Sequence, residues 1–406
     1  MNEEIFCTKC GTKNKATNRF CVKCGEPLLD LSDTNEEAHV ETQGDSKAQA
    51  ATHQTEANQA DRAASTTEEA TSIMDNVTSR LNSWTGGEGN VKISFSEFFG
   101  QVFQKHSTEE AEKLFIVGTK ETTPKIAELT VSQVQPWFFA RVLAFIFILG
   151  FLMELLAGLN SRVGVLALVN VIFAVAVPVS ALILFFECNV YQNISFYQVV
   201  KMAFIGGVLS LILTMVLDEL VGSNGQFNLL GAGQTGFAEE LAKVLIAAYF
   251  ISKFRARHIL NGLLIGAAVG TGFAAFENVL YMFDDQTGAL LPVSTAIIRT
   301  IFSISDHTEW CAIASAGLVM VSAGRKVTSS DFLNGRFLKF LGLVMLIHTC
   351  WDWEALNRFG SLKFITLAII TWIVVLVLIQ AGLREVKTEQ EQVAASKLSN
   401  DWDVGC

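Results

Sequence analysis

The sequence predicts an all-α polytopic membrane protein of about eight transmembrane helices, preceded by a short cysteine-rich module. Half of the 406 residues are hydrophobic and 17% are charged, a composition typical of multi-pass membrane proteins. The apolar residues are also segregated. No apolar stretch before Trp137 is long enough to span a bilayer. From Trp137 to Leu383, most of the chain consists of apolar stretches of that length. The net charge of −10 gives no support for nucleic-acid binding.

The N-terminal module contains four cysteines in two Cys-x-x-Cys pairs separated by ten residues: Cys7, Cys10, Cys21 and Cys24. A glycine follows each pair and allows a tight backbone turn toward the thiolates. Four thiolates at this spacing favour tetrahedral zinc with no open position for catalysis, over a redox or disulfide pair. We therefore expect residues 1–27 to form a zinc ribbon that folds around a structural zinc ion and contacts a protein partner.

The rest of the chain divides by composition. Residues 28–90 are rich in Ala, Thr, Ser, Glu, Gln and Asn, which predicts a disordered linker. In 91–135 apolar residues return at helical spacing and predict a juxtamembrane helical segment, with one helix beginning near Ser107. The multi-pass domain is expected over 136–384, followed by a cytoplasmic tail over 385–406.

Basic loops set the expected topology in the cell membrane. Lys253 and Arg257 mark one loop as cytoplasmic, Lys326 marks another, and Arg384 marks the segment after the last span. Eight crossings with both termini inside would satisfy all three. Residues 292–304 would add a ninth crossing, so we expect a short helix there that lies at or re-enters the outer surface. The predicted spans are 137–157, 163–186, 199–219, 236–252, 259–282, 305–323, 336–353 and 362–383.

Two of these spans carry acids that lipid-facing helices lack. A charged side chain near the bilayer centre costs roughly 2.5–3.5 kcal/mol, so it is found facing a protein interior or a wet cavity with partners. Glu239 and Glu240 lie four and three residues before Lys243, on one helix face. Glu277 lies four residues before Tyr281 in the next span.

Histidines begin or end two later spans. His307 begins the sixth, while His348 and Asp352 close the seventh at i,i+4 spacing, which suits a carboxylate that orients an imidazole. The topology places these residues near the outer surface, together with Glu239 and with Glu277, which lies about 9 Å below a helix exit. We expect all of them to meet in one buried polar site in the outer third of the membrane.

Such a site has the groups required for amide hydrolysis. A carboxylate in a dry pocket with one or two histidines can activate water and support a tetrahedral intermediate. The same residues could hold a metal ion, although the HExxH motif is absent. Structural ion pairs and interhelical hydrogen bonds are the simpler interpretations of the individual residues.

The sequence resembles the PrsW family of intramembrane proteases, which is related to the CAAX prenyl endopeptidase and bacteriocin-immunity superfamily. The E-E-x-x-K motif of the family matches 239–243, and its G-x-G-F-A-x-x-E-N-x-x-Y motif matches 270–281. Its two histidine blocks match 307–313 and 348–352. The resemblance covers about 205–355.

The resemblance implies an intramembrane endopeptidase that cuts a membrane-anchored protein, such as an anti-sigma factor, near the outer leaflet. It implies that Glu239 and Glu240 include the water-activating base and that His307 and His348 lie at the reaction centre. Family members are described both as metalloproteases and as glutamate-type proteases; we favour the glutamate type, with no cofactor in the membrane site. The expected supporting residues are Lys243, Glu277, Tyr281 and Asp352, the last of which stands where superfamily members often have Asn.

The alternative from another class is a non-catalytic membrane sensor or immunity-type binding protein that uses the same polar cluster. The zinc ribbon and the long linker, which suit protein contact, support this alternative. A proton-coupled transporter is a weaker third hypothesis, because the two halves of the chain show no obvious inverted repeat.

Overall fold

The computed structural model describes seven parts of the chain and divides it into two units, Met1–Glu68 and Glu69–Cys406. In the first unit, β1 (Glu4–Phe6) pairs antiparallel with β2 (Lys13–Lys15), and Ile5 lies opposite Asn14. The four cysteines expected to bind zinc lie outside the described residues. The described residues are 4–6, 12–15, 71–129, 134–160, 163–223, 225–284 and 287–403.

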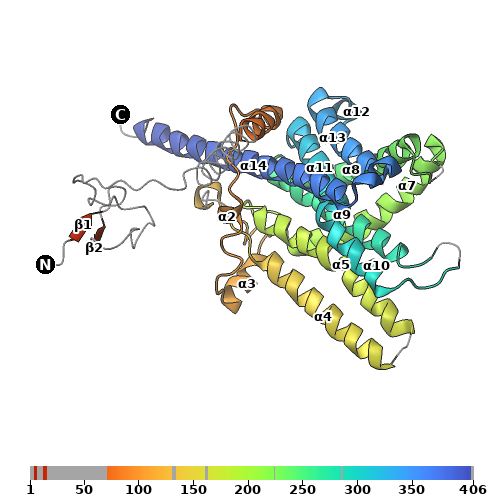
Figure 1. Cartoon of the computed structure of the whole chain (residues 1–406). Helices are drawn as coiled ribbons and strands as arrows, with labels where there is room; N and C mark the ends of the chain where they lie inside the picture. Colours follow the sequence, from red (N-terminus) through yellow and green to blue (C-terminus); the bar gives the residue numbers. More distant parts are fainter. Residues whose placement is uncertain are drawn as a thin grey trace, which may run out of the picture. The chain divides into compact units, whose positions relative to one another are not determined.

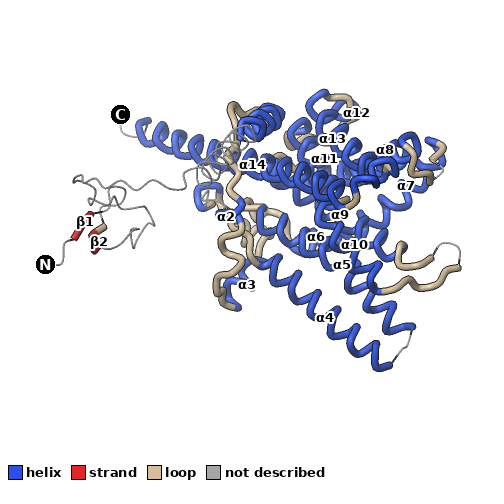
Figure 2. The backbone as a smooth tube through the Cα atoms, in the orientation of Figure 1, coloured by secondary structure: helices blue, strands red, loops and turns tan. Residues whose placement is uncertain are grey.

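The second unit is built from helices, as Figures 1 and 2 show, and the predicted all-α class is confirmed. Before the membrane domain lie helical residues 71–84, α2 (Phe95–Phe98), α3 (Thr108–Phe115) and the 3₁₀ turn η1 (Ile126–Glu128). The elements of the membrane domain are α4 (Phe138–Asn160), α5 (Val163–Cys188), α6 (Phe196–Lys201), the π-helical η2 (Met202–Gly206), α7 (Gly207–Val221), α8 (Leu229–Phe254), α9 (Ile259–Leu280), α10 (Val293–Phe302), η3 (Ser303–Ser305), α11 (His307–Ser322), α12 (Ser329–Phe332), α13 (Gly335–Asp352), η4 (Glu354–Phe359) and α14 (Ser361–Asp403).

Within the described residues, five helical stretches are long and apolar enough to cross a membrane, which makes the chain a multi-pass membrane protein. The other three predicted spans are present as helices α8, α11 and α13, but α8 and α13 carry several charged residues and α11 has only 16 residues. The count of eight crossings therefore stays a prediction. The five stretches are Phe138–Leu159, Val163–Cys188, Phe196–Val221, Ile259–Leu280 and Ser361–Ser396.

The segment that would have made a ninth crossing is a short helix. α10 has ten residues and is therefore about 15 Å long, half of what a hydrocarbon core of about 30 Å requires. The short helix predicted within 292–304 is confirmed, while its position at the outer surface stays a prediction.

The segment before the membrane domain is more ordered than its composition suggests. Helical residues 71–84 fall inside the predicted linker over 28–90, so the linker prediction extends too far toward its C-terminal end. Trp84 packs edge-on against Phe340 of α13 with ring centroids 5.5 Å apart, and this tertiary contact stabilises a helix that polar composition disfavours. Ser107 caps α3 in a capping box with Glu110, which confirms the predicted helix start.

Glycines determine how closely the central helices pack. α9 lies against α11 along Gly262, Gly266 and Gly270, where an added Cβ would overlap backbone or side-chain atoms of α11. On its other side, Gly272 lies against Ala203 of η2 and Gly207 of α7. Small residues at four-residue spacing let helix backbones approach in this way. The close packing fixes the C-terminal half of α9 relative to the N-terminal end of α11.

We expect Gly272→Ala to destabilise the protein in detergent by roughly 1–3 kcal/mol, because the new Cβ would overlap the carbonyl oxygen of Ala203. The measurement is the midpoint of thermal unfolding. Gly342→Ala in α13 is the matched control, since no described atom lies within 4 Å of its Cβ and alanine favours a helix. An unchanged midpoint for Gly272→Ala would contradict this packing.

Candidate active site

Four helices bring the predicted polar residues to one cavity of about 710 Å³. Glu239 of α8, Glu277 of α9, His307 of α11, and His348 and Asp352 of α13 all line its wall. Glu240 and Lys243 are buried behind this wall, in contact with the lining residues. The structure therefore places side chains from four separate helices together, as the sequence predicts.

Lys243 is the charged centre of the cluster and is fully buried. Its Nζ lies 2.7 Å from Glu240 Oε1 and 3.5 Å from Glu239 Oε2, the ion pairs expected from the spacing on α8. Nζ also lies 2.6 Å from His307 Nδ1 and 4.3 Å from the ring centre of Phe273. One ammonium thus compensates two carboxylates and joins α8 to α11 and α9.

His307 is oriented through both ring nitrogens. Nδ1 faces Lys243, which can only donate, so Nδ1 accepts and the ring proton lies on Nε2. Nε2 then donates to Glu277 Oε2 at 2.8 Å. Local sequence also sets the position of the ring: Asp306 and Glu309 form a capping box that begins α11 at His307.

His348 lies between carboxylates. Its Nδ1 is 2.8 Å from Glu240 Oε1, and its Nε2 is 3.2 Å from Asp352 Oδ2. The ring also packs on Trp310, with centroids 4.8 Å apart. These contacts fix the plane of the imidazole and aim its Nε2 edge at the cavity.

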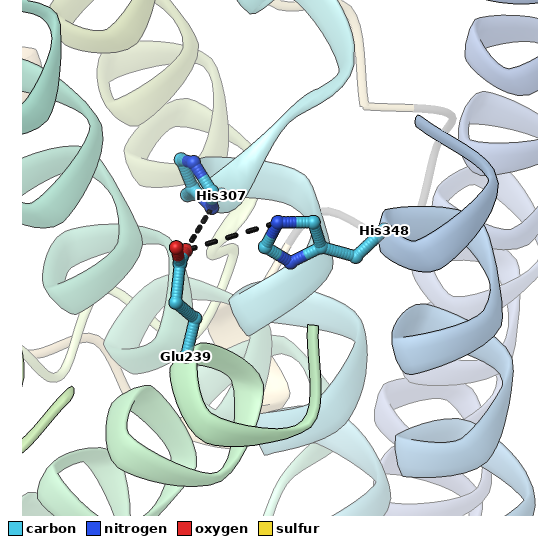
Figure 3. Close-up of side chains that lie close together, drawn as sticks. All are labelled: Glu239, His307 and His348. Carbon is cyan, nitrogen blue, oxygen red and sulfur yellow. Dashed lines mark ion pairs between the residues drawn. The ribbon is translucent and has the colours of Figure 1, made fainter. Parts of the chain in front are cut away.

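Glu239 is the acid of the pair that reaches the cavity. Figure 3 shows its carboxylate facing both rings, with Oε2 at 3.7 Å from His307 Nδ1 and 3.8 Å from His348 Nε2. This oxygen is buried and has no hydrogen-bond partner among the described residues. A buried carboxylate oxygen left in this way is costly, which indicates that a water, substrate or ion completes the site.

The same three residues form a group of metal-type donors. One carboxylate oxygen of Glu239 and one ring nitrogen each of His307 and His348 lie within 4.8 Å of one another. By donor type and spacing they fit a divalent ion such as zinc. Lys243 Nζ lies on the lone pair of His307 Nδ1, however, so an ion would reach that nitrogen only after the ammonium had moved away.

Sequence reasoning missed Arg299 of α10. Its guanidinium stacks over the ring of Tyr281 at 3.8 Å, and its Nη2 lies 3.8 Å from Glu277 Oε2. Arg299 Nε also donates to Asn278. Tyr281, expected as a supporting residue, lies on the cavity wall with 44% of its surface exposed. The sequence signal that could have identified Arg299 is that it is the single charged residue of the segment 292–304.

Comparisons with known proteins agree with this geometry. Residues 196–379 match the model of a family described as PrsW family intramembrane metalloprotease, and residues 6–28 match that of a zinc-ribbon domain. A relative named Protease PrsW from Bacillus subtilis (strain 168) is 27% identical over 208 residues, which cover 49% of this chain and 83% of the relative. Another Protease PrsW, from Halalkalibacterium halodurans, is 28% identical over 190 residues, 45% and 82% of the two chains. No solved structure matches.

We expect Lys243→Met to destabilise the protein by about 3–5 kcal/mol, because it leaves buried carboxylates without their compensating charge. Denaturation in mixed detergent micelles measures the loss. The double variant Lys243→Met/Glu240→Gln removes one of the uncompensated charges and should recover part of the lost stability. Equal losses for the single and double variants would argue against a Lys243–Glu240 ion pair.

Proposed function

Through residues 196–379 this chain belongs to the PrsW family of intramembrane proteases, and we propose that it hydrolyses a peptide bond of a membrane-anchored protein beside Glu239. The observation that carries this proposal is Glu239 Oε2, which is buried in a cavity wall between two histidines. It forms an ion pair with Lys243 at 3.5 Å but accepts no hydrogen bond from the described residues. A base in this position takes a proton from water as the water oxygen adds to the peptide carbonyl. It then returns the proton to the leaving amine.

The cavity distinguishes the two adjacent acids. Glu239 lines it, whereas Glu240 lies behind the wall, bonded to Lys243 and His348. We therefore assign Glu239 as the base and Glu240 as a positioning residue. His348 can share its Nε2 proton between Asp352 and the oxyanion that develops on the carbonyl. His307, whose two ring nitrogens are bonded to Lys243 and Glu277, is a positioning residue that holds its ring beside Glu239.

A divalent ion held by Glu239, His307 and His348 would polarise the carbonyl and lower the pKa of a bound water. The contact between Lys243 and His307 supports the metal-independent glutamate route instead, because the ammonium blocks Nδ1, the ring nitrogen that lies 3.7 Å from Glu239 Oε2. We assign the route through Glu239 on this basis.

We also propose an orientation in the membrane, a substrate and a partner. Both termini lie in the cytoplasm, and cleavage occurs near the outer leaflet, in accord with the basic loops that follow α8 and α11. The family resemblance suggests an anti-sigma factor as the membrane-anchored substrate. The zinc-ribbon match supports one structural zinc on Cys7, Cys10, Cys21 and Cys24, in a module that binds a protein partner.

Glu239→Gln should abolish cleavage of a membrane-anchored substrate by the reconstituted protein, with a loss of at least about 10²-fold, because the amide cannot accept a proton from water. Substrate and product are followed by gel electrophoresis. Glu154→Gln in α4, outside the cavity wall, is the control and should cleave normally. Substrate binding by the wild type without any cleavage would instead support the non-catalytic sensor.

Counting metal atoms separates the two catalytic routes. The purified wild type should contain one zinc per chain, and the variant Cys7→Ser/Cys10→Ser should contain none while still cleaving substrate. Elemental analysis of the same samples used for the cleavage assay makes the comparison. A second metal atom that survives in the cysteine variant and disappears in His348→Ala would overturn the metal-independent route.

A further inference from the structure

A second cavity, of about 550 Å³, meets the first at Glu239. It lies between α7 and α9, and we call it the α7–α9 groove. Most of its lining is apolar, including Leu211, Ile212 and Met215 of α7 and Phe276 and Leu280 of α9. The two cavities share three lining residues, which are Glu239, Glu277 and Tyr281. The groove therefore ends at the carboxylate assigned as the base.

α7 and α9 approach each other closely at Gly207 and Gly272, where an added Cβ at either glycine would overlap the other helix or η2. The groove is lined by residues that follow these glycines on both helices, from Val208 to Met215 and from Phe273 to Tyr281. Ile212, Met215 and Leu280 are 54%, 72% and 62% exposed. On helices that cross a membrane, such exposure means that the groove opens sideways to the lipid.

The groove also contains an unpartnered polar group. Thr214 is 94% buried, since its relative exposure is 6%, and its Oγ1 has no hydrogen-bond partner in the described parts of the chain. Asp218, one turn later on α7, lines the larger cavity, and its Oδ1 is likewise buried without a partner. A buried hydroxyl in an apolar groove is costly unless something binds it.

We propose that the α7–α9 groove receives the membrane segment of the substrate, and that Thr214 binds its backbone where the segment unwinds beside Glu239. This inference rests on the proposed protease function. A helix must open before a peptide bond can be attacked, and each freed backbone group inside a bilayer needs a new partner. Thr214 supplies a donor and an acceptor at that place. A lipid acyl chain would fill the groove but offers nothing for the hydroxyl to bind.

Site-specific crosslinking tests where the substrate lies. A photoreactive residue replaces Ile212 in the full-length Glu239→Gln variant, reconstituted with a single-span protein that has a Leu-rich membrane segment. Leu155 of α4, 68% exposed on another face, is the control position. We expect the photoreactive residue at position 212 to form adducts with the membrane segment of the substrate, and the one at position 155 to form few. Equal yields from both positions, or adducts with lipid only, would overturn the proposal.

Kinetics test the hydroxyl. Thr214→Val keeps the shape and removes the hydroxyl, and it should lower kcat/KM about tenfold, the size of one lost hydrogen bond to a buried group. Thr214→Ser keeps the hydroxyl and should stay within about twofold of the wild type. Full activity in Thr214→Val, or equal losses in both variants, would overturn the role of Thr214. The same photoreactive residue is also placed at 212 in the protein that keeps Glu239. If that protein forms adducts with the membrane segment but never cleaves the substrate, the protease function is refuted and the groove assignment stands.

Discussion

The site depends on one buried ammonium. Two adjacent carboxylates on a membrane helix repel each other and lose their hydration, and neither cost is acceptable without a nearby positive charge. Lys243 provides that charge one turn along the same helix, at 2.7 Å from Glu240 and 3.5 Å from Glu239. Because its Nζ also contacts His307, the same charge fixes the ring on α11 and, through that ring, the carboxylate of Glu277 on α9. The Lys243 side chain therefore links three helices, α8, α9 and α11.

Backbone packing gives this charge network its rigidity. The glycines of α9 let α11 approach until an added Cβ at Gly270 would overlap the carbonyl of His307. The capping box of Asp306 and Glu309 starts α11 at that histidine, so its ring enters the site from the first turn of the helix. Helix capping and close packing thus place the His307 ring in the cavity wall. Hydrogen bonds then only select its orientation.

Much of this arrangement could be predicted from the sequence, because it follows from spacing along helices. The i,i+3 and i,i+4 separations predict the contacts of Lys243 and of His348 with Asp352, and alternating topology predicts that four spans meet. Which of Glu239 and Glu240 faces the cavity could not be predicted, because adjacent residues differ by about 100° around a helix whose neighbours are unknown. Arg299 was missed for a related reason: its contacts with Tyr281 and Glu277 cross between elements. Hydropathy alone does not give the number of crossings, because the charged residues of α8 lower its mean hydropathy.

An intramembrane protease must bring water to a peptide bond that lies in lipid. The two cavities differ in polarity in a way that suits this requirement. The larger cavity is lined by polar groups such as Arg299, Asp306 and Asp352, whose hydration makes it a natural path for water. The α7–α9 groove has an apolar lining that suits a hydrophobic segment and excludes water. Glu239 belongs to both walls, so the carboxylate stands at the boundary where water and an apolar chain can meet. A base placed deeper in the groove would lack water, and one placed further into the polar cavity would lie beyond reach of a chain still held by the bilayer.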